Sequence, residues 1–435
     1  MKLPATLRAL QYRNFQLFFG GQLISLIGTW MQNVAQAWLV YRLTKSAVLL
    51  GGIGFAGQIP VFLLSPVGGI VADRYSRRKV VIATQTASMV LALALALLTL
   101  SGRVQIWHIF ALSAALGVVN SFDVPARQAF IVDMVGRNDL MNAIALNSSV
   151  FNASRMVGPA IAGILVATIG EGWCFFANAV SYLAVIAGLA AMRVARHEKL
   201  AQAGSPIAHI VEGFRFVMQN APIHALLMLL GVVSLTGMPY AVLMPIFADR
   251  ILHGGAAALG WLMGATGVGA LAGALLLASR RDLKGLSVWV AMSAIAFGCG
   301  LVAFAFSRNY GLSLAILAPV GFAMMIEMGS SNTLIQSMVP DRLRGRVMSV
   351  YSMMFMGMAP IGSLLAGWSA ARLGAPITVA LGGVICVAAA SVFWSFLPRI
   401  RVHARRLIVA QQMAGGDPPQ EMTGGSLALE ERERN

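Results

Sequence analysis

The chain has 435 residues, of which 58% are hydrophobic and only 11% are charged. A soluble domain needs about 25% charged residues to cover its exterior, so this composition excludes a water-soluble fold and predicts a membrane protein. The net charge of +16 would favour a nucleic-acid partner in a soluble chain, but here the basic residues fall between apolar stretches.

Long stretches without Asp, Glu, Lys or Arg follow one another along the chain. They cover 15–40, 46–72, 80–102, 104–122, 172–192, 216–248, 251–279, 285–307, 309–326, 347–371 and 373–398, and one more, 140–170, is interrupted only by Arg155. A helix of about 20 apolar residues crosses a bilayer core about 30 Å thick. We therefore expect an all-α membrane protein with 12 transmembrane helices.

The basic residues alternate in density from one loop to the next. They are frequent before residue 15, at 74–79, 127–137, 193–215, 280–284 and 342–346, and after 398, and sparse in the loops between these segments. Because Lys and Arg accumulate at the cytoplasmic ends of spans, we expect a multi-pass membrane protein with both termini on the cytoplasmic side. These short clusters lack the basic groove and interleaved aromatics of a nucleic-acid site, so no nucleic-acid partner is expected.

An internal repeat relates the two halves of the chain. At an offset of 204 residues without a gap, Gly69 matches Gly273, and the same register pairs Arg77 with Arg281 and Asp123 with Glu327. Duplicated halves are typical of transporters, so we expect two pseudo-symmetric six-helix bundles. The expected boundaries are an N-terminal segment 1–13, a bundle 14–194, a linker 195–221, a second bundle 222–398 and a tail 399–435.

The linker and the tail are expected on the cytoplasmic side. Apolar and polar residues alternate at roughly helical spacing over 206–219, which predicts an amphipathic helix along the membrane surface; a solvated tether is the alternative. The tail is basic after Pro398 and rich in Gly, Pro and Glu from Gly415 onward, so its end is expected to be disordered.

The segment 69–79, Gly-Ile-Val-Ala-Asp-Arg-Tyr-Ser-Arg-Arg-Lys, resembles motif A of the major facilitator superfamily, and the residues that carry this resemblance are Gly69, Asp73, Arg74, Arg77 and Arg78. Ser76 replaces the usual glycine, so the turn has to form without positive φ. We expect Gly69 to permit close helix approach, and the charged residues to form ion pairs that latch the cytoplasmic ends in one conformation. The alternative is that they only set topology.

Further segments, at 123–128, 142–147, 152–163 and 339–349, are similar to the macrolide-efflux and enterobactin-exporter branch of that superfamily. Gly158, Pro159 and Gly163 resemble motif C of antiporters, although Ala162 stands where a second glycine is usual. This resemblance implies export; the alternative is a small-residue packing face. A corresponding gate in the second half is expected from Arg280, Arg281, Asp341, Arg342, Arg344 and Arg346.

Three charged residues interrupt the predicted spans or stand at their ends. We expect Asp123 to face Arg77 or Arg78, and Glu327 to face Arg280 or Arg281, as cytoplasmic gate pairs, and either acid is a candidate to carry a transported proton. Arg155 lies near mid-membrane. It is expected to neutralise a carboxylate, to hydrogen-bond a carbonyl, or to bind an anionic part of a substrate, and these three roles stay open.

Polar residues in the first and seventh spans suggest a substrate cavity, with Gln32, Asn33, Gln36 and Tyr240 as candidate lining residues. No nucleotide-binding loop, hydrolase motif or metal-ligand cluster stands in the sequence, so no enzyme activity, cofactor or metal site is expected.

The resemblance implies the major facilitator fold and a secondary transporter, expected as a monomer, that exports drugs such as macrolides, or siderophores, by alternating access in exchange for protons. Membrane lipid, a small amphipathic substrate and protons are the expected partners. A lysophospholipid flippase of the same fold and a non-transporting membrane receptor are the alternatives.

Overall fold

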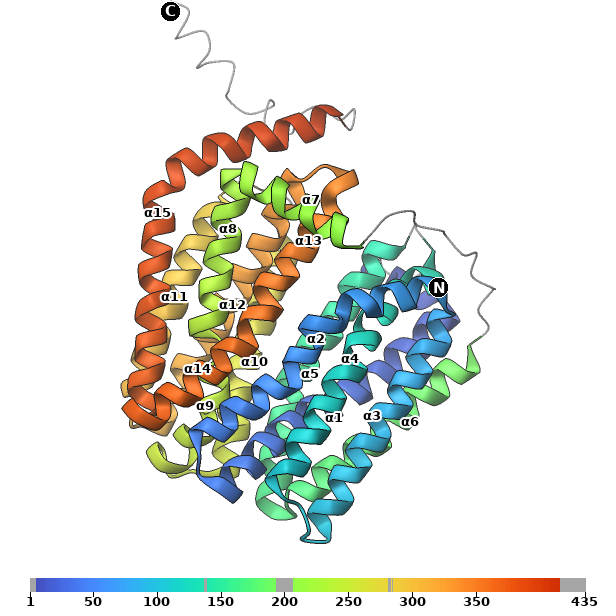
Figure 1. Ribbon diagram of the computed structural model, residues 1–435, viewed down its shortest axis with the longest axis vertical. Helices are drawn as coiled ribbons and strands as arrows, with labels where there is room; N and C mark the ends of the chain where they lie inside the picture. Colours follow the sequence, from blue (N-terminus) through green and yellow to red (C-terminus); the bar gives the residue numbers. More distant parts are fainter. Residues whose placement is uncertain (1–4, 137–138, 193–205, 281–282, 284, 415–435) are drawn as a thin grey trace, which may run out of the picture.

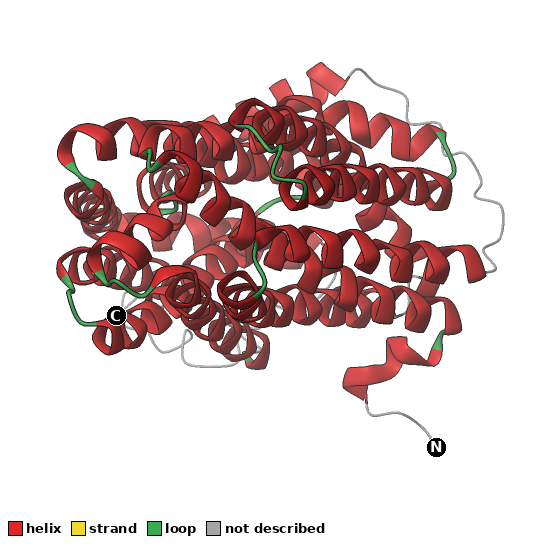
Figure 2. Ribbon diagram, turned by 90° about the horizontal axis from the view of Figure 1, so that it is seen from below, coloured by secondary structure: helices red, strands yellow, loops and turns green. Residues whose placement is uncertain are grey.

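A computed structural model describes residues 5–136, 139–192, 206–280, 283 and 285–414. Within these residues all regular secondary structure is helical, and Figure 2 shows the helices joined by short loops. The predicted helix of the linker lies over Pro206–Gln219 (α7). The predicted disorder of the tail from Gly415, and the linker residues 193–205, lie outside the described residues.

The first half of the chain forms one group of helices (Figure 1). A short helix, Ala5–Gln11 (η1), precedes α1 (Arg13–Thr44), α2 (Ala47–Arg74), α3 (Arg77–Leu100), α4 (Ile106–Val135), α5 (Leu140–Thr168) and α6 (Glu171–Ala191). Within this group α1 packs on α5 and α6, α2 on α4, and α3 on α4 and α6. Small residues permit the close crossings: a Cβ on Gly28 would lie 2.6 Å from the Ser181 hydroxyl of α6.

The second half forms the other group, in which two spans are interrupted by π-helical turns. Its elements are α8 (Ala221–Val232), η2 (Val233–Gly237), α9 (Tyr240–Ile246), η3 (Phe247–Ile251), α10 (Gly255–Ser279), α11 (Leu286–Phe306), α12 (Tyr310–Met338), α13 (Asp341–Ser352), η4 (Met353–Gly357), α14 (Met358–Leu373) and α15 (Ala375–Ala414). Elements α8 to η3 form one continuous span, and so do α13 to α14. Wider π turns are common at functional sites.

Eleven spans in the described residues are long and apolar enough to cross a membrane. The helix α1 is also long enough at 32 residues, but its amide side chains, among them Gln32, Asn33 and Gln36, make it less apolar than the others. Together they give 12 membrane-spanning helices in two groups of six, so the predicted fold is confirmed.

The internal repeat is visible in the helix boundaries. Ile106 and Tyr310 start α4 and α12, Glu171 and Ala375 start α6 and α15, and each pair lies 204 residues apart. Duplication therefore explains the matching lengths of α4 and α12.

The two bundles pack against each other along two seams. Helix α5 packs on α10, and α2 packs on α14. A Cβ on Gly163 would lie 2.9 Å from the Cα of Gly260, and one on Gly367 would lie 3.1 Å from the Cα of Gly51. Gly163 and Gly367 are themselves repeat-related, so the seams follow the pseudo-twofold symmetry.

Both of these glycine contacts lie toward one end of the molecule. We call the end that holds η1, the α2–α3 turn and the start of α13 the N-terminal face, and the end that holds the α1–α2, α5–α6 and η3–α10 loops the opposite face. At the opposite face the Lys45 Nζ lies 2.8 Å from the Asp249 carboxylate. This ion pair joins the bundles, and its partners are again 204 residues apart.

Several helices run beyond the charge-free stretches that predicted them. The predicted fourth and tenth spans end at Phe122 and Ile326, whereas α4 and α12 continue to Val135 and Met338. Helix α15 does not end at Pro398 as expected but continues to Ala414, and Figure 1 shows its last part bending across the N-terminal face. A proline within a helix bends it rather than ending it where the freed carbonyl finds other partners.

Candidate functional site

A cavity of about 900 Å³ lies between the two bundles, in the half of the molecule nearer the N-terminal face. Its walls are contributed by α2, α4, α13 and η4 and consist of Val61, Phe62, Ser65, Pro66, Gly69, Val124, Pro125, Gln128, Arg342, Gly345, Arg346, Met348, Ser349, Ser352, Met353 and Met356. The wall is mainly apolar, with polar groups and two guanidinium groups at one end. Such a mixture suits amphipathic ligands.

The residues predicted to line a cavity are not among these. Gln32 is buried and accepts a hydrogen bond of 2.7 Å from Asn178 of α6. Gln36 donates to the Ser113 hydroxyl of α4 at 2.9 Å, Asn33 is exposed, and Tyr240 is buried against Phe297. None of the four residues therefore lines this cavity, and Gln32 and Gln36 instead form hydrogen bonds within the first bundle.

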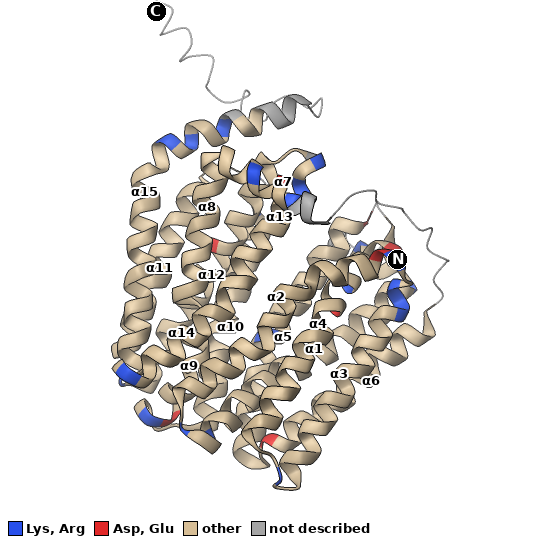
Figure 3. Cartoon of the chain, in the orientation of Figure 1, with Lys and Arg blue, Asp and Glu red and all other residues tan. Residues whose placement is uncertain are grey.

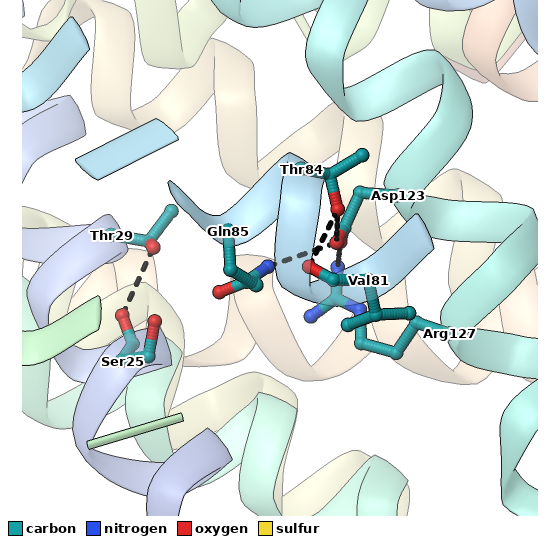
Figure 4. A network of polar contacts seen from close by, with 7 residues as sticks. All are labelled: Ser25, Thr29, Val81, Thr84, Gln85, Asp123 and Arg127. Carbon is teal, nitrogen blue, oxygen red and sulfur yellow. Dashed lines mark hydrogen bonds and ion pairs between the residues drawn. The ribbon is translucent and has the colours of Figure 1, made fainter. Parts of the chain in front are cut away.

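Asp123 is the centre of a buried polar network in the first bundle (Figure 4). Its carboxylate accepts hydrogen bonds from Thr84 at 2.7 Å and from Gln85 at 2.9 Å, and it pairs with Arg127 at 2.7 Å, one turn later on α4. The charge is therefore fully compensated inside the bundle. Arg127 was not among the predicted partners, although the i,i+4 spacing of Asp123 and Arg127 is a sequence signal for such a pair.

The expected partners of Asp123 are engaged elsewhere, so that prediction was wrong. Arg77 lies 2.9 Å from Asp133 and donates to the Ala129 carbonyl, farther along α4. Arg78 donates to the last carbonyls of α6, at Leu189 and Ala190. A cation at a helix C-terminus satisfies free carbonyls and the helix dipole, so these two arginines tie α3 to its own bundle.

The remaining motif A residues stand at the N-terminal face. Asp73 and Arg74 are exposed, and in the described residues neither has a hydrogen bond or ion pair across to the second bundle. Gly69 was expected to permit close helix approach, but a Cβ there would meet nothing within 4 Å; the preceding Gly68 makes that approach, against Ser121 of α4. Ser76 forms the turn with φ −61°, so no positive φ is needed.

Glu327, the repeat mate of Asp123, has very different surroundings. It is 1% exposed, and its one hydrogen bond in the described structure comes from the Ser331 hydroxyl at 3.4 Å, while its other carboxylate oxygen is buried without a partner. No basic side chain pairs with it among the described residues. The expected partner Arg280 stacks instead on the Trp289 ring at 4.2 Å, and Arg281 lies outside the described residues.

The other predicted gate residues of the second half lie on α13. Arg346 pairs with Glu212 of α7, and Arg342 is exposed at the end of the cavity. Arg344 is also exposed, and the side chain of Asp341 lies outside the described residues. Arg346 thus connects the linker helix to the cavity wall.

Arg155 lies midway along α5, among side chains from both bundles. Its guanidinium carbon is 5.7 Å from the centre of the Trp30 ring of α1, and its Nη2 is 3.6 Å from the Met324 sulfur of α12. Tyr240 of α9 is close enough to interact with it electrostatically. No carboxylate pairs with Arg155 in the described part of the chain, so the predicted ion-pair role has no partner here.

The motif C-like residues line both surfaces of α5. A Cβ on Gly158 would lie 2.6 Å from the Trp30 Cβ of α1. On the other side, the Pro159 carbonyl and Gly163 contact Gly260 of α10. The packing role is therefore present, and because α10 belongs to the other bundle, the packed surface is itself part of a seam.

Comparison with known proteins extends over nearly the whole chain. A model of the transmembrane secretion effector family matches residues 5–416. The staphyloferrin A transporter of Staphylococcus aureus (strain NCTC 8325 / PS 47) is 26% identical over 380 residues, which cover 87% of this chain and 94% of that protein. The multidrug efflux pump Tap of Mycolicibacterium fortuitum is 28% identical over 397 residues, covering 86% and 93%.

A third relative and a solved structure agree with this assignment. The enterobactin exporter EntS of Escherichia coli O6:K15:H31 (strain 536 / UPEC) is 25% identical over 420 residues, covering 95% of this chain and 96% of that protein. The crystal structure of the nucleoside transporter NupG (D323A mutant) superposes with a TM-score of 0.68 at 14% identity, covering 88% of this chain and 99% of the other, and shows the shared fold. The chain is thus a multi-pass membrane protein that belongs to the major facilitator superfamily, in the family of transmembrane secretion effectors.

Proposed function

We propose that this protein exports amphipathic small molecules across the cell inner membrane by alternating access, with proton uptake as the driving reaction. The observation that carries the proposal is the placement of the cavity. It lies between the bundles near the N-terminal face, whereas Gly163, Gly260, Gly51 and Gly367 bring the bundles into contact toward the opposite face. A central site open to one side and closed to the other is what alternating access requires.

The distribution of charge supports a cytoplasmic N-terminal face. Figure 3 shows Lys and Arg concentrated at the end that holds η1, α7, α13 and the end of α15, with fewer at the opposite end and almost none between. The positive-inside rule assigns the richer side to the cytoplasm. Both termini are then cytoplasmic, and the cavity opens to the cytoplasm, ready to collect a substrate for export.

The walls of the cavity support an amphipathic substrate. Phe62, Met348, Met353 and Met356 offer apolar, adaptable surface, and Gln128 adds an amide. Methionine side chains repack around ligands of different shape. The relatives named above, a staphyloferrin A transporter, a multidrug efflux pump and an enterobactin exporter, support siderophores or drugs as the substrate class.

Glu327 is our candidate for the proton-binding group. It is buried with a single hydroxyl donor, and the titratable side chains that interact with it, Tyr351 of α13 and Cys386 of α15, carry no positive charge. Burying an unpaired carboxylate is costly, so holding a proton stabilises this conformation. Release of that proton requires the bundle to admit water or a cation, which links protonation to conformation.

Uptake into inverted membrane vesicles tests the proposal. Cells that express the protein, and cells with an empty vector, are first compared for tolerance of macrolides and for siderophore secretion; the active compound is then offered to vesicles with an acidic interior. We expect uptake that requires the protein and stops when an ionophore dissipates the pH gradient. Transfer of phospholipid without dependence on the gradient, or ligand binding without uptake, would contradict the proposal.

A further inference from the structure

We infer that Arg155 binds an anionic group of the transported molecule, and that the substrates of this protein are therefore amphipathic organic anions. The inference rests on the proposed function and narrows its substrate class from amphipathic molecules in general to amphipathic anions. Neither the family assignment nor the proposed proton site requires it.

The position of Arg155 is that of a central binding site. It lies midway between Leu140 and Thr168, the ends of α5, and its neighbours Trp30, Tyr240 and Met324 lie near the middle of α1, of the span α8 to η3, and of α12. Two of these four elements belong to each bundle. Arg155 therefore stands where the bundles face each other at mid-depth of the membrane.

No carboxylate in the described residues neutralises the charge of the guanidinium. A guanidinium has five N–H donors and no acceptor, and the contact found for it in the described residues is a weak acceptor, the Met324 sulfur at 3.6 Å. An unpaired cation inside a membrane protein is costly and is retained for a function. An anion that arrives with the substrate would pair with it in bidentate fashion.

The side chain also remains accessible. Arg155 is partly exposed, although Tyr240 and Met324 beside it are buried. Its neighbours come from both bundles, so the side chain lies at the interface between them. A ligand that binds the guanidinium therefore has to enter between the bundles.

The charged residues that line the cavity near the N-terminal face are positive, as Arg155 is. Its wall includes Arg342 and Arg346 and no Asp or Glu. Arg346 is partly compensated by Glu212 of α7, so Arg342, which is exposed, supplies the free charge at the entrance. A path lined by one sign of charge concentrates ligands of the opposite sign.

Aromatic side chains next to Arg155 indicate the rest of the ligand. Trp30 packs edge-on against Phe151, with ring centroids 5.6 Å apart, and also lies beside the guanidinium. Aromatic surface beside a cation suits a flat apolar group that bears a carboxylate or a catecholate. This chemistry favours aromatic organic anions over cationic molecules of similar size.

Binding of two matched probes tests the inference independently of transport. The full-length protein in phosphatidylcholine nanodiscs is titrated with 3-hydroxy-2-naphthoate and with its neutral primary amide, and binding is followed by probe fluorescence anisotropy. Charge-assisted hydrogen bonds contribute about 1.5–3 kcal/mol, so we expect the carboxylate to bind about ten-fold to a hundred-fold more tightly than the amide. Arg155→Gln should remove this preference by weakening carboxylate binding alone.

Two further variants separate this role from folding and from general electrostatics. Arg155→Lys keeps the charge without the planar fork and should retain part of the preference. Arg103→Gln removes an exposed arginine near the opposite face and should change neither affinity. Equal binding of both probes by the wild-type protein, no binding of either, or a preference that survives in Arg155→Gln would overturn the inference. Intact preference in a protein that never drives uptake into vesicles would instead overturn the proposed function.

Discussion

Asp123 and Glu327 occupy repeat-related positions but meet opposite surroundings. The donors to Asp123 are Thr84, Gln85 and Arg127, and 204 residues later their places are taken by Val288, Trp289 and Ser331. Both halves thus carry an acid at this position, but of the three replacements only Ser331 donates a hydrogen bond to it in the described structure. Asp123 is thus a compensated structural charge, and Glu327 is the acid that we propose as the proton carrier.

Replacing Glu327 by Gln should uncouple transport from the pH gradient. The amide keeps the size and hydrogen bonding of the protonated acid, so substrate exchange at equal pH should persist while gradient-driven uptake falls to the level of empty-vector vesicles. Glu171→Gln is the matched control, because Glu171 pairs with Arg42 at the opposite face. Gradient-driven uptake unchanged in Glu327→Gln would remove Glu327 as the proton carrier.

Replacing Arg127 by Gln should destabilise the first bundle. The change leaves the Asp123 carboxylate buried with only two neutral donors, at a cost of about 2 kcal/mol. Adding Asp123→Asn removes the charge that Arg127 compensated, so the double variant should unfold in detergent at a temperature above that expected from the sum of the two single losses. Strictly additive shifts would mean that the two side chains do not interact.

The sequence identifies the two buried acids, but the partners predicted for Asp123 were wrong. The repeat and the cost of charge within a span single out Asp123 and Glu327, yet they do not give the rotation of α4 about its axis. Arg77 had two acids on α4 as possible partners and lies against Asp133, farther along the same helix. The packing of α4 against α3 decides which of the two acids Arg77 meets. This packing depends on residues along the whole interface between the two helices.

At the scale of the helices, the seam between α5 and α10 depends on small residues at defined places. A Cβ on Gly260 would lie 2.5 Å from the Pro159 carbonyl oxygen, whereas one on Gly264, about one turn later, would meet only ordinary contacts at 3.6 and 3.9 Å. Helices can approach this closely only where a side chain is absent.

Gly260→Ala should therefore impair the protein more than Gly264→Ala does. The first change separates the bundles near the opposite face and should lower both gradient-driven uptake and the unfolding temperature. The second should leave both within error of the wild type. Equal effects of the two substitutions would show that close packing at this seam does not control the conformation.

The helices themselves were largely predictable, and their ends were not. Charge-free stretches identify the spans because the bilayer admits few charges. They place the end of the fourth span too early because Asp123 and Arg127 neutralise each other within α4. The π turns at Val233–Gly237 and Met353–Gly357 carry no sequence signal that hydropathy detects, although the second of them forms part of the cavity wall.

At the scale of the whole molecule, the Lys45–Asp249 pair closes the opposite face across the two bundles. Both side chains are partly exposed, so the pair contributes at most about 1 kcal/mol. That is enough to change the populations of two nearly balanced conformations several-fold.

Reversing one charge of this pair should favour separation of the bundles at the opposite face. In a variant without the native cysteines, Ser363→Cys, buried in the seam of α14 with α2, should react several-fold faster with a hydrophilic maleimide when Lys45→Asp is added. The exchanged pair, Lys45→Asp with Asp249→Lys, should restore the slow rate. A rate that responds to neither change would exclude the pair as a gate.

Sequence reasoning predicted the pseudo-symmetry of the molecule but not which side the cavity opens to. The offset of 204 residues that relates Gly163 to Gly367 is present in the sequence, and it predicts two equivalent seams between the bundles. The same sequence encodes every conformation of the cycle, and the balance between them depends on weak contacts such as the Lys45–Asp249 pair.

Distances between spin labels at the two faces test alternating access most directly. In the variant without native cysteines, one labelled pair joins Tyr75 and Arg342, exposed near the tips of α2 and α13, and the other joins Arg103 and Arg308, exposed near the opposite face. Changing the pH or adding substrate should shorten the first distance while it lengthens the second. Two distances that stay constant, or that change in the same direction, would contradict the account.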